Sequence, residues 1–423
     1  MRVRDIQERS APHRGITLRS ILLGALTVAF LCIYTNYSEF KAHSAALVMS
    51  NLPMAAFLPF ILWIFLNTLL RTFAPAFALS GTELLVILGM SWTAGNIPAI
   101  GWTGYWMGIV TAPYYYAAPE NRWQELFFDY LPRWLLTDPK SSAIPWFYNG
   151  LPEGADIPWG AWLSPLFWWF TASMAIVVIG VSLAVIFSRQ WIDHEKLVFP
   201  LAQIPMDLTE DFDGRSRVPG FLKSKLFWIG FAWPMFVICW NIVGYFHPNF
   251  PRIEIFDSYM KRKVYFSRYA PPIPFRVLPS VIGFTYLCNL DILFSFWFFY
   301  LLSVIQMGVM NRTGFTVGLS NQTASPHEIV NLESHGALTF LVFWSVWISR
   351  KHLREVLQKA WNGEQNPDNP VSYRIAVIGL ILGVLYLLGF LCQAGIHILY
   401  AAPLVLLIFI GYFGVTKYLG RRY

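Results

Sequence analysis

Eight or nine long apolar stretches, separated by short polar segments, set the pattern of this chain. A helix needs about 20 mostly apolar residues to cross the hydrocarbon core of a bilayer. Only a helix or a closed barrel satisfies every backbone N–H and C=O group there. The pattern therefore predicts an all-α, polytopic transmembrane bundle. Its clearest spans are Ile21–Tyr34, Met54–Leu70, Leu163–Phe187, Leu226–Phe246, Val281–Met310, Ala337–Ile348, Ile375–Leu391 and Ile396–Val415.

Two further segments are too irregular or too short to be ordinary spans. Ser80-Gly-Thr-Glu83 predicts the start of a third span, with Ser80 as the helix cap and Glu83 as its capping-box partner. The helical pattern then breaks at Ala94–Pro98 and Gly101–Gly104. The run Leu197–Leu208 contains two prolines and is too short to cross as a helix. Both segments predict broken or re-entrant helices, which form substrate sites in secondary transporters.

Residues 117–162 form the longest segment that does not span, and they are rich in Trp, Tyr and Pro. Their low density of Lys and Arg indicates an extracytoplasmic loop. Loops of this length usually contain short helices or act as lids. We expect Trp123–Leu136 to form an amphipathic helix on the membrane surface. The acidic residues of the loop are Glu120, Glu125, Asp129, Asp138, Glu153 and Asp156, against the basic residues Arg122, Arg133 and Lys140.

Composition supports a membrane protein, because charged residues make up 13% of the chain, about half the roughly 25% of soluble domains. The formal net charge of +7 does not indicate a nucleic-acid partner, since the basic residues gather beside spans. This is the positive-inside pattern, and it predicts a multi-pass protein of the inner or plasma membrane with both termini in the cytoplasm. These basic residues are Arg2, Arg4, Arg9, Arg14, Arg19, Arg350, Lys351, Arg354, Lys417, Arg421 and Arg422.

The number of crossings stays open. Five basic residues between His247 and Ser334 also indicate a cytoplasmic segment: Lys261, Arg262, Lys263, Arg268 and Arg276. That assignment agrees with the rest of the chain only if Leu197–Leu208 adds a crossing, or if the third span and Gly101–Tyr116 count as two.

Polar residues within apolar stretches are the candidates for a solute or ion pathway. An ionised carboxylate in lipid costs a few kcal/mol unless it faces a cavity or a partner, which makes Asp291 a candidate proton or cation relay. The other candidates are Glu83, Asn96, Lys196, Gln203, Asn289 and Gln306. Each also has a structural interpretation: Asp291 and Glu83 can cap helices, and the amides can join helices by hydrogen bonds.

The cluster Asp193-His194-Glu195-Lys196 can gate a cytoplasmic mouth by pairing across a helix break, or it is a solvated surface. His327-Glu328 and Glu333-Ser-His335 lack the His-Glu-x-x-His spacing of a zinc helix, so we interpret them as loop residues. The four cysteines show no C-x-x-C spacing. No phosphate loop or nucleophile elbow is present, and we expect no metal, no cofactor and no enzymatic activity.

Four short motifs occur in the order found in a known transporter family. They are Ser80-Gly-Thr-Glu83, Lys196-Leu-Val-Phe-Pro200, Val264-Tyr-Phe-Ser267 and a stretch from Ile282 to Ser295 with an early Gly and a central Asn. In these motifs the chain resembles the oligopeptide transporter superfamily, particularly its yellow stripe-like branch, over roughly residues 80 to 310. An uncharacterised group of bacterial membrane proteins is the expected closer relative.

The resemblance implies a secondary active transporter of a short peptide or metal chelate, coupled to protons or to another cation such as sodium. Family members are longer, so the chain corresponds to the N-terminal part of a longer transporter in this interpretation. After Pro200 the family has a small-residue Ser-Gly-Thr-Ala run, whereas this chain has Leu-Ala-Gln-Ile-Pro205. The family's substrate preference therefore does not carry over directly.

Two other functions remain open from the sequence. One is a membrane-embedded enzyme that acts on a lipid-linked substrate and uses loop acids such as Asp129 or Asp156. The other is a structural or sensory membrane protein in which the buried polar groups join helices. A homodimer is an assembly that the sequence also leaves open. We expect one integral membrane domain over residues 1–423, with 117–162 as its loop subregion.

Overall fold

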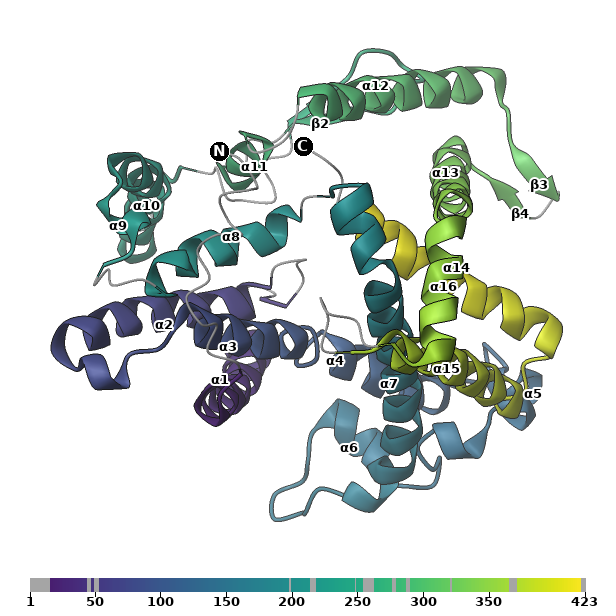
Figure 1. The fold of residues 1–423 in the computed structure, drawn as a ribbon. Coiled ribbons are helices and arrows are strands. Elements are labelled where there is room, and N and C mark those ends of the chain that lie inside the picture. Colours follow the sequence, from purple (N-terminus) through teal and green to yellow (C-terminus); the bar gives the residue numbers. More distant parts are fainter. Residues whose placement is uncertain are drawn as a thin grey trace. The chain divides into compact units, whose positions relative to one another are not determined.

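The computed structural model describes residues 16–43, 47–48, 53–197, 199–213, 218–247, 249–253, 262–275, 279–286, 290–319, 322–364 and 371–419 (Figure 1). This part of the chain is almost entirely helical, which confirms the all-α prediction. The first half contains α1 (Leu18–Asn36), α2 (Met54–Phe73), α3 (Gly81–Ala94), α4 (Trp102–Tyr115), α5 (Trp123–Leu126), α6 (Ala143–Asn149), α7 (Trp159–Arg189) and α8 (Pro200–Thr209).

The second half continues with helices and two short hairpins. Its elements are α9 (Gly220–Lys223), α10 (Lys225–Phe246), β1 (Arg262–Val264), β2 (Ile273–Phe275), α11 (Pro279–Tyr286), α12 (Leu290–Thr313), β3 (Val317–Leu319), β4 (Gln322–Ala324), α13 (Pro326–Ile348), α14 (Arg350–Asn362), α15 (Tyr373–Gln393) and α16 (Ile398–Leu419). Strands β1 and β2 pair antiparallel, as do β3 and β4. Two π-helical turns, Tyr37–Lys41 and Gln190–His194, extend α1 and α7.

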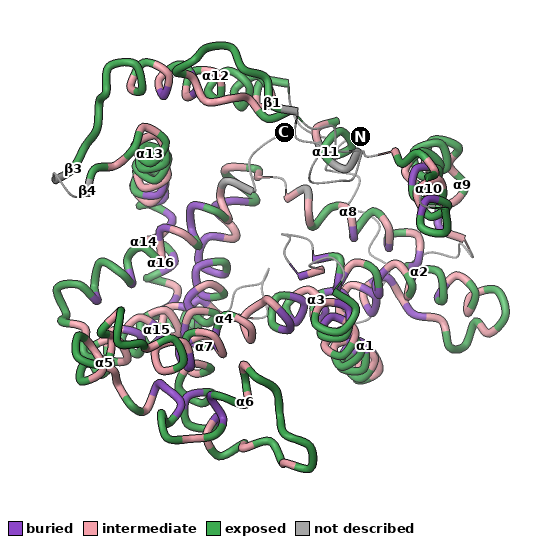
Figure 2. The backbone as a smooth tube through the Cα atoms, turned by 180° about the vertical axis from the view of Figure 1, so that it is seen from behind, coloured by how far each residue is buried: buried purple, intermediate pink, exposed green. Residues whose placement is uncertain are grey.

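Eight helices of the described chain are long and apolar enough to cross a membrane. Their apolar side chains are largely exposed on the protein surface, most of all along α10 and α12 (Figure 2), as lipid contact requires. The chain is a multi-pass helical membrane protein. The spans are Leu18–Lys41, Met54–Phe73, Trp159–His194, Lys225–Phe246, Leu290–Thr313, Pro326–Ile348, Tyr373–Gln393 and Ile398–Lys417.

The chain divides into two compact units. Unit 1 consists of residues 1–183, 201–223 and 375–408, and unit 2 consists of residues 184–200, 224–374 and 409–423. Helices α7 and α16 each begin in unit 1 and end in unit 2.

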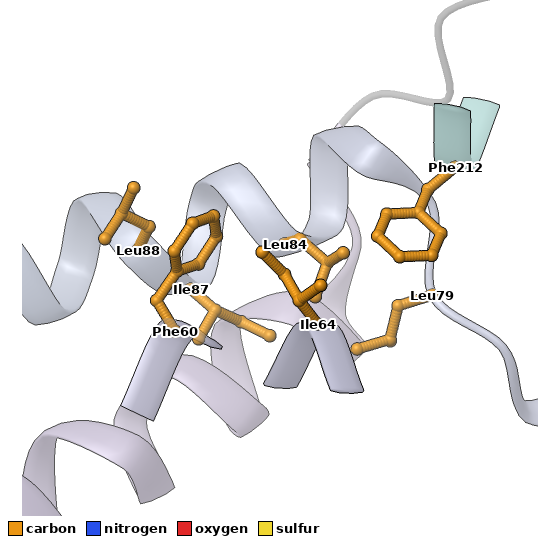
Figure 3. Packing of buried hydrophobic residues seen from close by; sticks show 7 residues of the cluster. All are labelled: Phe60, Ile64, Leu79, Leu84, Ile87, Leu88 and Phe212. Carbon is orange, nitrogen blue, oxygen red and sulfur yellow. The ribbon is translucent and has the colours of Figure 1, made fainter. Parts of the chain in front are cut away.

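Helices α1, α2 and α3 build one of the hydrophobic clusters of unit 1. Residues Leu84, Ile87 and Leu88 of α3 recur at helical spacing, so they share one face of the helix. This face packs against Phe60 and Ile64 of α2 (Figure 3). The same cluster includes Leu79 and Phe212, which connects the end of α8 to this core.

Two glycines bring α15 close to α7 within unit 1. A Cβ atom added at Gly383 would lie 2.8 Å from Ile179 Cγ1, and one at Gly379 would lie 2.9 Å from Ser182 Oγ. Gly379 and Gly383 are four residues apart, which places both on one helix face in the small-xxx-small arrangement of packed membrane helices. Tyr386 extends this contact by donating a hydrogen bond to Thr171 Oγ1 at 2.6 Å.

Three predicted helical segments differ from the structure. Trp123–Leu136 is not one helix: it contains α5 and two 3₁₀ turns, Phe128–Tyr130 and Arg133–Leu135. Pro132 lies between these turns, and a proline disfavours helical backbone at the residue before it. The Val281–Met310 stretch contains α11 and α12 rather than a single element. The span predicted at Ala337 begins earlier, at Pro326, because Ser325 and Glu328 form a capping box there.

Candidate functional site

Glu83 lies at the start of α3, where helices α1, α2 and α3 of unit 1 meet. Its side chain is 4% exposed and forms an ion pair of 2.7 Å with Arg19 Nη2 of α1. Thr17 Oγ1 donates to Glu83 Oε1 at 2.7 Å, and the Ser80 N–H donates to Oε2 at 3.0 Å. The Ser80–Glu83 capping box is confirmed, and the carboxylate also joins two helices through Arg19.

The segment after α8 completes the cluster around Glu83. Asp213 accepts a hydrogen bond of 2.9 Å from the Gly81 N–H and so supplies a second cap for α3. Arg71 of α2 donates to the carbonyls of Leu79 and Phe212. A Cβ atom at Gly81 would lie 2.7 Å from Thr209 O, so only glycine lets the two segments approach this closely. This network fastens the end of α8 to α3.

The other end of α3 is a break in the helical backbone. Helix α3 stops at Ala94 and α4 starts at Trp102, as the glycines and proline predict. The intervening turn is closed by local hydrogen bonds, including Trp102 N–H to Asn96 O at 3.0 Å. Ala99 has φ of 56°, a left-handed conformation that is unfavourable for a residue with a Cβ atom. Asn96 is exposed at this break.

Glu39 is a carboxylate at this break that sequence reasoning missed. It belongs to the π-helical turn at the end of α1, and its Oε2 accepts a hydrogen bond of 3.5 Å from the Ile100 N–H. In the sequence Glu39 stands beside Lys41 and His43, so it resembles an ordinary polar border after the first apolar stretch. What sets Glu39 apart is its contact with the α3–α4 break, which lies about 60 residues later in the chain. Only the fold reveals this contact.

Glu83 and Asn96 therefore mark opposite ends of α3. At a rise of 1.5 Å per residue, they lie about 20 Å apart along the helix axis. Glu83 is satisfied by neighbouring side chains, whereas Asn96 borders irregular backbone beside Glu39.

In unit 2 the candidate gating residues surround the π-helical turn that ends α7. Glu195 Oε2 pairs with Lys417 Nζ of α16 at 2.7 Å, and both side chains are mostly buried. Gln190 Nε2 donates to the other Glu195 oxygen at 3.3 Å. Asp193 pairs with Arg189 at 3.5 Å, and the ring of His194 lies 6.4 Å from that of His352. The turn is thus tied to α14 and α16.

Helix α14 packs against the last turns of α7. The buried His352 ring hydrogen-bonds through Nε2 to the Ile186 carbonyl at 2.8 Å. Glu355 lies 4.0 Å from Arg189 and accepts a 2.6 Å hydrogen bond from Lys359. That hydrogen bond and the charge of Lys359, together with Arg189, hold the pKa of Glu355 below its ordinary value.

The remaining pathway candidates do not converge on one place. Lys196 is exposed and has φ of 49°, so the chain turns sharply there before α8. Gln203 is exposed on α8. Asp291 lies in the first turn of α12, where an acid stabilises the helix dipole, and Asn289 lies outside the described residues. Gln306 donates to Glu333 of α13 at 2.6 Å.

The histidines and acids of residues 327–335 lie in α13, not in a loop as expected. Within the described chain, no group of three or more His, Cys, Asp or Glu side chains could hold a metal ion. His327 contacts Asn331, and His335 contacts the Asn331 carbonyl. These residues therefore form helix-surface hydrogen bonds.

Two shallow depressions lie on the surface of unit 2, and neither includes a predicted pathway residue. One is on α10, lined by Ile238, Asn241, Ile242, Tyr245 and Phe246. The other is on α14, lined by Arg354, Leu357, Gln358, Trp361 and Asn362.

Comparison with protein families gives a match over almost the whole chain. No curated protein and no solved structure matches the chain. Residues 10–419, almost the whole length, match a family described as "Family of unknown function (DUF6785)". The chain belongs to this family.

Proposed function

We propose that this protein is a secondary active transporter of a small polar solute, such as a short peptide or a metal chelate, coupled to protons or another cation. The observation that carries the proposal is the break between α3 and α4. Irregular backbone at membrane depth is tolerated where it is buried in protein or borders a water-filled space. Discontinuous helices of this kind form the solute sites of many secondary transporters.

Two side chains at the break have the chemistry for such a site. Asn96 is exposed and offers an amide donor and acceptor. The half-buried Glu39 supplies a carboxylate next to the Ile100 N–H. Glu39 lies in the last turn of the Leu18–Lys41 span, and a carboxylate in a membrane segment is a natural proton or cation relay. In this proposal Asn96 contacts the solute and Glu39 carries the coupling ion.

Uptake into proteoliposomes tests the proposal. Labelled short peptides and iron or nickel chelates are offered with and without an inward proton or sodium gradient. We expect gradient-dependent uptake of at least one solute by the wild type. Glu39→Gln should abolish the response to the gradient, and Asn96→Ala should raise the KM for the solute.

Glu120→Gln is the matched control, because Glu120 is an exposed acid of the outer loop. It should leave uptake unchanged. If no solute of the panel accumulates under either gradient, or if Glu39→Gln and Glu120→Gln behave alike, the transport proposal fails.

A structural or sensory role is the second candidate, and a specific observation favours it. Glu83 and Gln306, two predicted pathway residues, both form hydrogen bonds between helices: Glu83 with Arg19, and Gln306 with Glu333. Such pairs hold membrane helices together. Uptake that persists in a folded Gln306→Leu variant would assign Gln306 to this structural role within a transporter.

A further inference from the structure

Helix α14 starts at the membrane surface. The α13 span ends at Ile348, and α14 begins at Arg350. Residues 350–354 are two to six residues beyond the span, so a helical chain places them at most about 3–9 Å from its end, whatever the direction of α14. The headgroup layer on each side of a bilayer is of similar thickness, about 5–8 Å. The first turns of α14 therefore lie at the depth of lipid phosphates.

Tryptophans of α13 support this depth. Trp344 and Trp347 are 55% and 63% exposed, as expected for rings of the interfacial aromatic belt. The guanidinium of Arg350 lies over the Trp347 ring, 5.2 Å from its centroid, and donates to the Trp347 carbonyl at 3.0 Å. Arg350 is thus held at the level of the interfacial aromatic rings, and its guanidinium keeps further N–H groups that can donate to a ligand.

Three cations of α14 have no acidic partner within the described residues. Arg350, Lys351 and Arg354 are exposed, and none forms an ion pair there. The single acid of the helix, Glu355, is already paired with Lys359 and lies beside Arg189. The start of α14 therefore carries uncompensated positive charge.

One face of α14 combines these cations with apolar side chains. Arg350, Arg354, Leu357 and Trp361 follow each other at helical spacing and form a single stripe. Leu357 is 57% exposed and Trp361 is 90% exposed. The opposite face, with His352, Val356 and Ala360, is buried. We call the four residues Arg350, Arg354, Leu357 and Trp361, together with the neighbouring Lys351, the α14 stripe.

We propose that α14 lies along the membrane surface and that the α14 stripe binds anionic phospholipids, with Arg350, Lys351 and Arg354 on the headgroup phosphates and Leu357 and Trp361 in the acyl boundary. Charge complementarity and the position directly after a span select this occupant. Basic residues next to a transmembrane helix attract anionic lipid, and a basic helix with Trp and Leu on one face inserts into the interface.

Lipid titration of the purified full-length protein tests the charge contribution. Native mass spectrometry in detergent measures binding of phosphatidylglycerol and phosphatidylcholine. We expect the wild type to prefer phosphatidylglycerol. Each cation near an anionic surface contributes roughly fivefold in affinity, so Arg350→Gln/Lys351→Gln/Arg354→Gln should lose on the order of a hundredfold.

The matched control removes the same charge elsewhere. Arg122→Gln/Arg133→Gln/Lys140→Gln lies in the outer loop and should keep the preference. Equal binding of the two lipids by the wild type, or equal losses in both triple variants, would overturn the proposal. So would displacement of phosphatidylglycerol by millimolar inorganic phosphate, since the site would then recognise free phosphate.

Spin labels in vesicles test the insertion of the helix. The four cysteines, Cys32, Cys239, Cys288 and Cys392, are replaced by serine, and a nitroxide is placed at Leu357→Cys, Trp361→Cys or Asn362→Cys. In phosphatidylglycerol vesicles, labels at 357 and 361 should be more accessible to oxygen than to a water-soluble nickel chelate, and the label at 362 should show the reverse. Preferential access of the nickel chelate to 357 and 361 would show a solvated stripe and contradict insertion.

Discussion

The ion pair of Glu83 and Arg19 shows what a single residue can and cannot reveal. Spacing alone predicts that Glu83 closes a capping box with Ser80, because both partners lie within one turn. Arg19 is 64 residues away, and no local pattern indicates that contact. The sequence therefore predicts the local half of the role of Glu83 and misses the half that joins α1 to α3.

Removing the Glu83 carboxylate should destabilise the protein. In Glu83→Ala, Arg19 loses its partner, and the donors Thr17 and Ser80 lose their acceptor. Breaking a fully buried pair costs roughly 3–5 kcal/mol, and Arg19 keeps 40% of its side-chain surface exposed. We expect a loss of about 2 kcal/mol, seen as a lower Tm in detergent.

Glu125→Ala is the control, because its ion pair with Arg122 is exposed on both sides and is worth about 0–1 kcal/mol. Equal Tm values for Glu83→Ala and the wild type would contradict a stabilising role of the Glu83–Arg19 ion pair between α1 and α3.

At the scale of elements, the sequence predicts where helices break better than where they touch. Glycine and proline destabilise a regular helix at the positions where they occur. The α3–α4 break and the short α8 can therefore be predicted from the local sequence. The prediction of one surface helix at Trp123–Leu136 is wrong, because Pro132 interrupts a segment whose apolar pattern is typical of an amphipathic helix. The close approach of α15 to α7 requires that Gly379 and Gly383 face α7. A helix that is apolar all round has no hydrophobic periodicity from which this orientation could be predicted.

Gly383→Leu should disturb the packing of α15 on α7. The new side chain would meet Ile179 and the Ala175 carbonyl, and overpacking typically costs about 1–3 kcal/mol. We expect a lower Tm and a slower migrating, partly unfolded species in detergent. Gly389→Leu is the matched control, because a Cβ atom there has nothing within 4 Å. Equal Tm values for the two variants would exclude close packing at Gly383.

The contact of α14 with α7 should depend on pH through Glu355. Its pKa is lowered by Lys359 and Arg189, so its contribution is present above the ordinary glutamate value of about 4.3. The contribution is lost as the pH falls through the lowered pKa. The Tm difference between the wild type and Glu355→Gln should be small and positive at pH 7 and shrink as the pH falls below about 4.3. A difference that grows on acidification would contradict this.

At the scale of the whole molecule, helix content follows from hydropathy, but the crossing count does not. Eight described helices qualify as spans by length and composition. The broken pair α3–α4 and the ten-residue α8 are each too short to qualify alone. Whether such pieces cross depends on protein neighbours, which composition does not encode.

Charge distribution predicts the sidedness that length leaves open. The loop 117–162 is acidic and α14 is basic, so we expect them on opposite sides of the membrane. In a cysteine-free background, Asn149→Cys and Asn362→Cys should react with an impermeant maleimide from opposite sides of oriented vesicles. Reaction from the same side would show that the number of crossings between Asn149 and Asn362 is even, which contradicts the sidedness predicted from charge.

The widened turn at Gln190–His194 has a consequence for protein engineering. The Glu195 N–H bonds back five residues to the Gln190 carbonyl, so this turn holds one residue more than an α-helical turn would. Deleting Ile192 would restore ordinary winding and move Lys196 into the place of Glu195. Lys417 would then face a like charge instead of its present partner, which makes a one-residue shortening more damaging here than most substitutions.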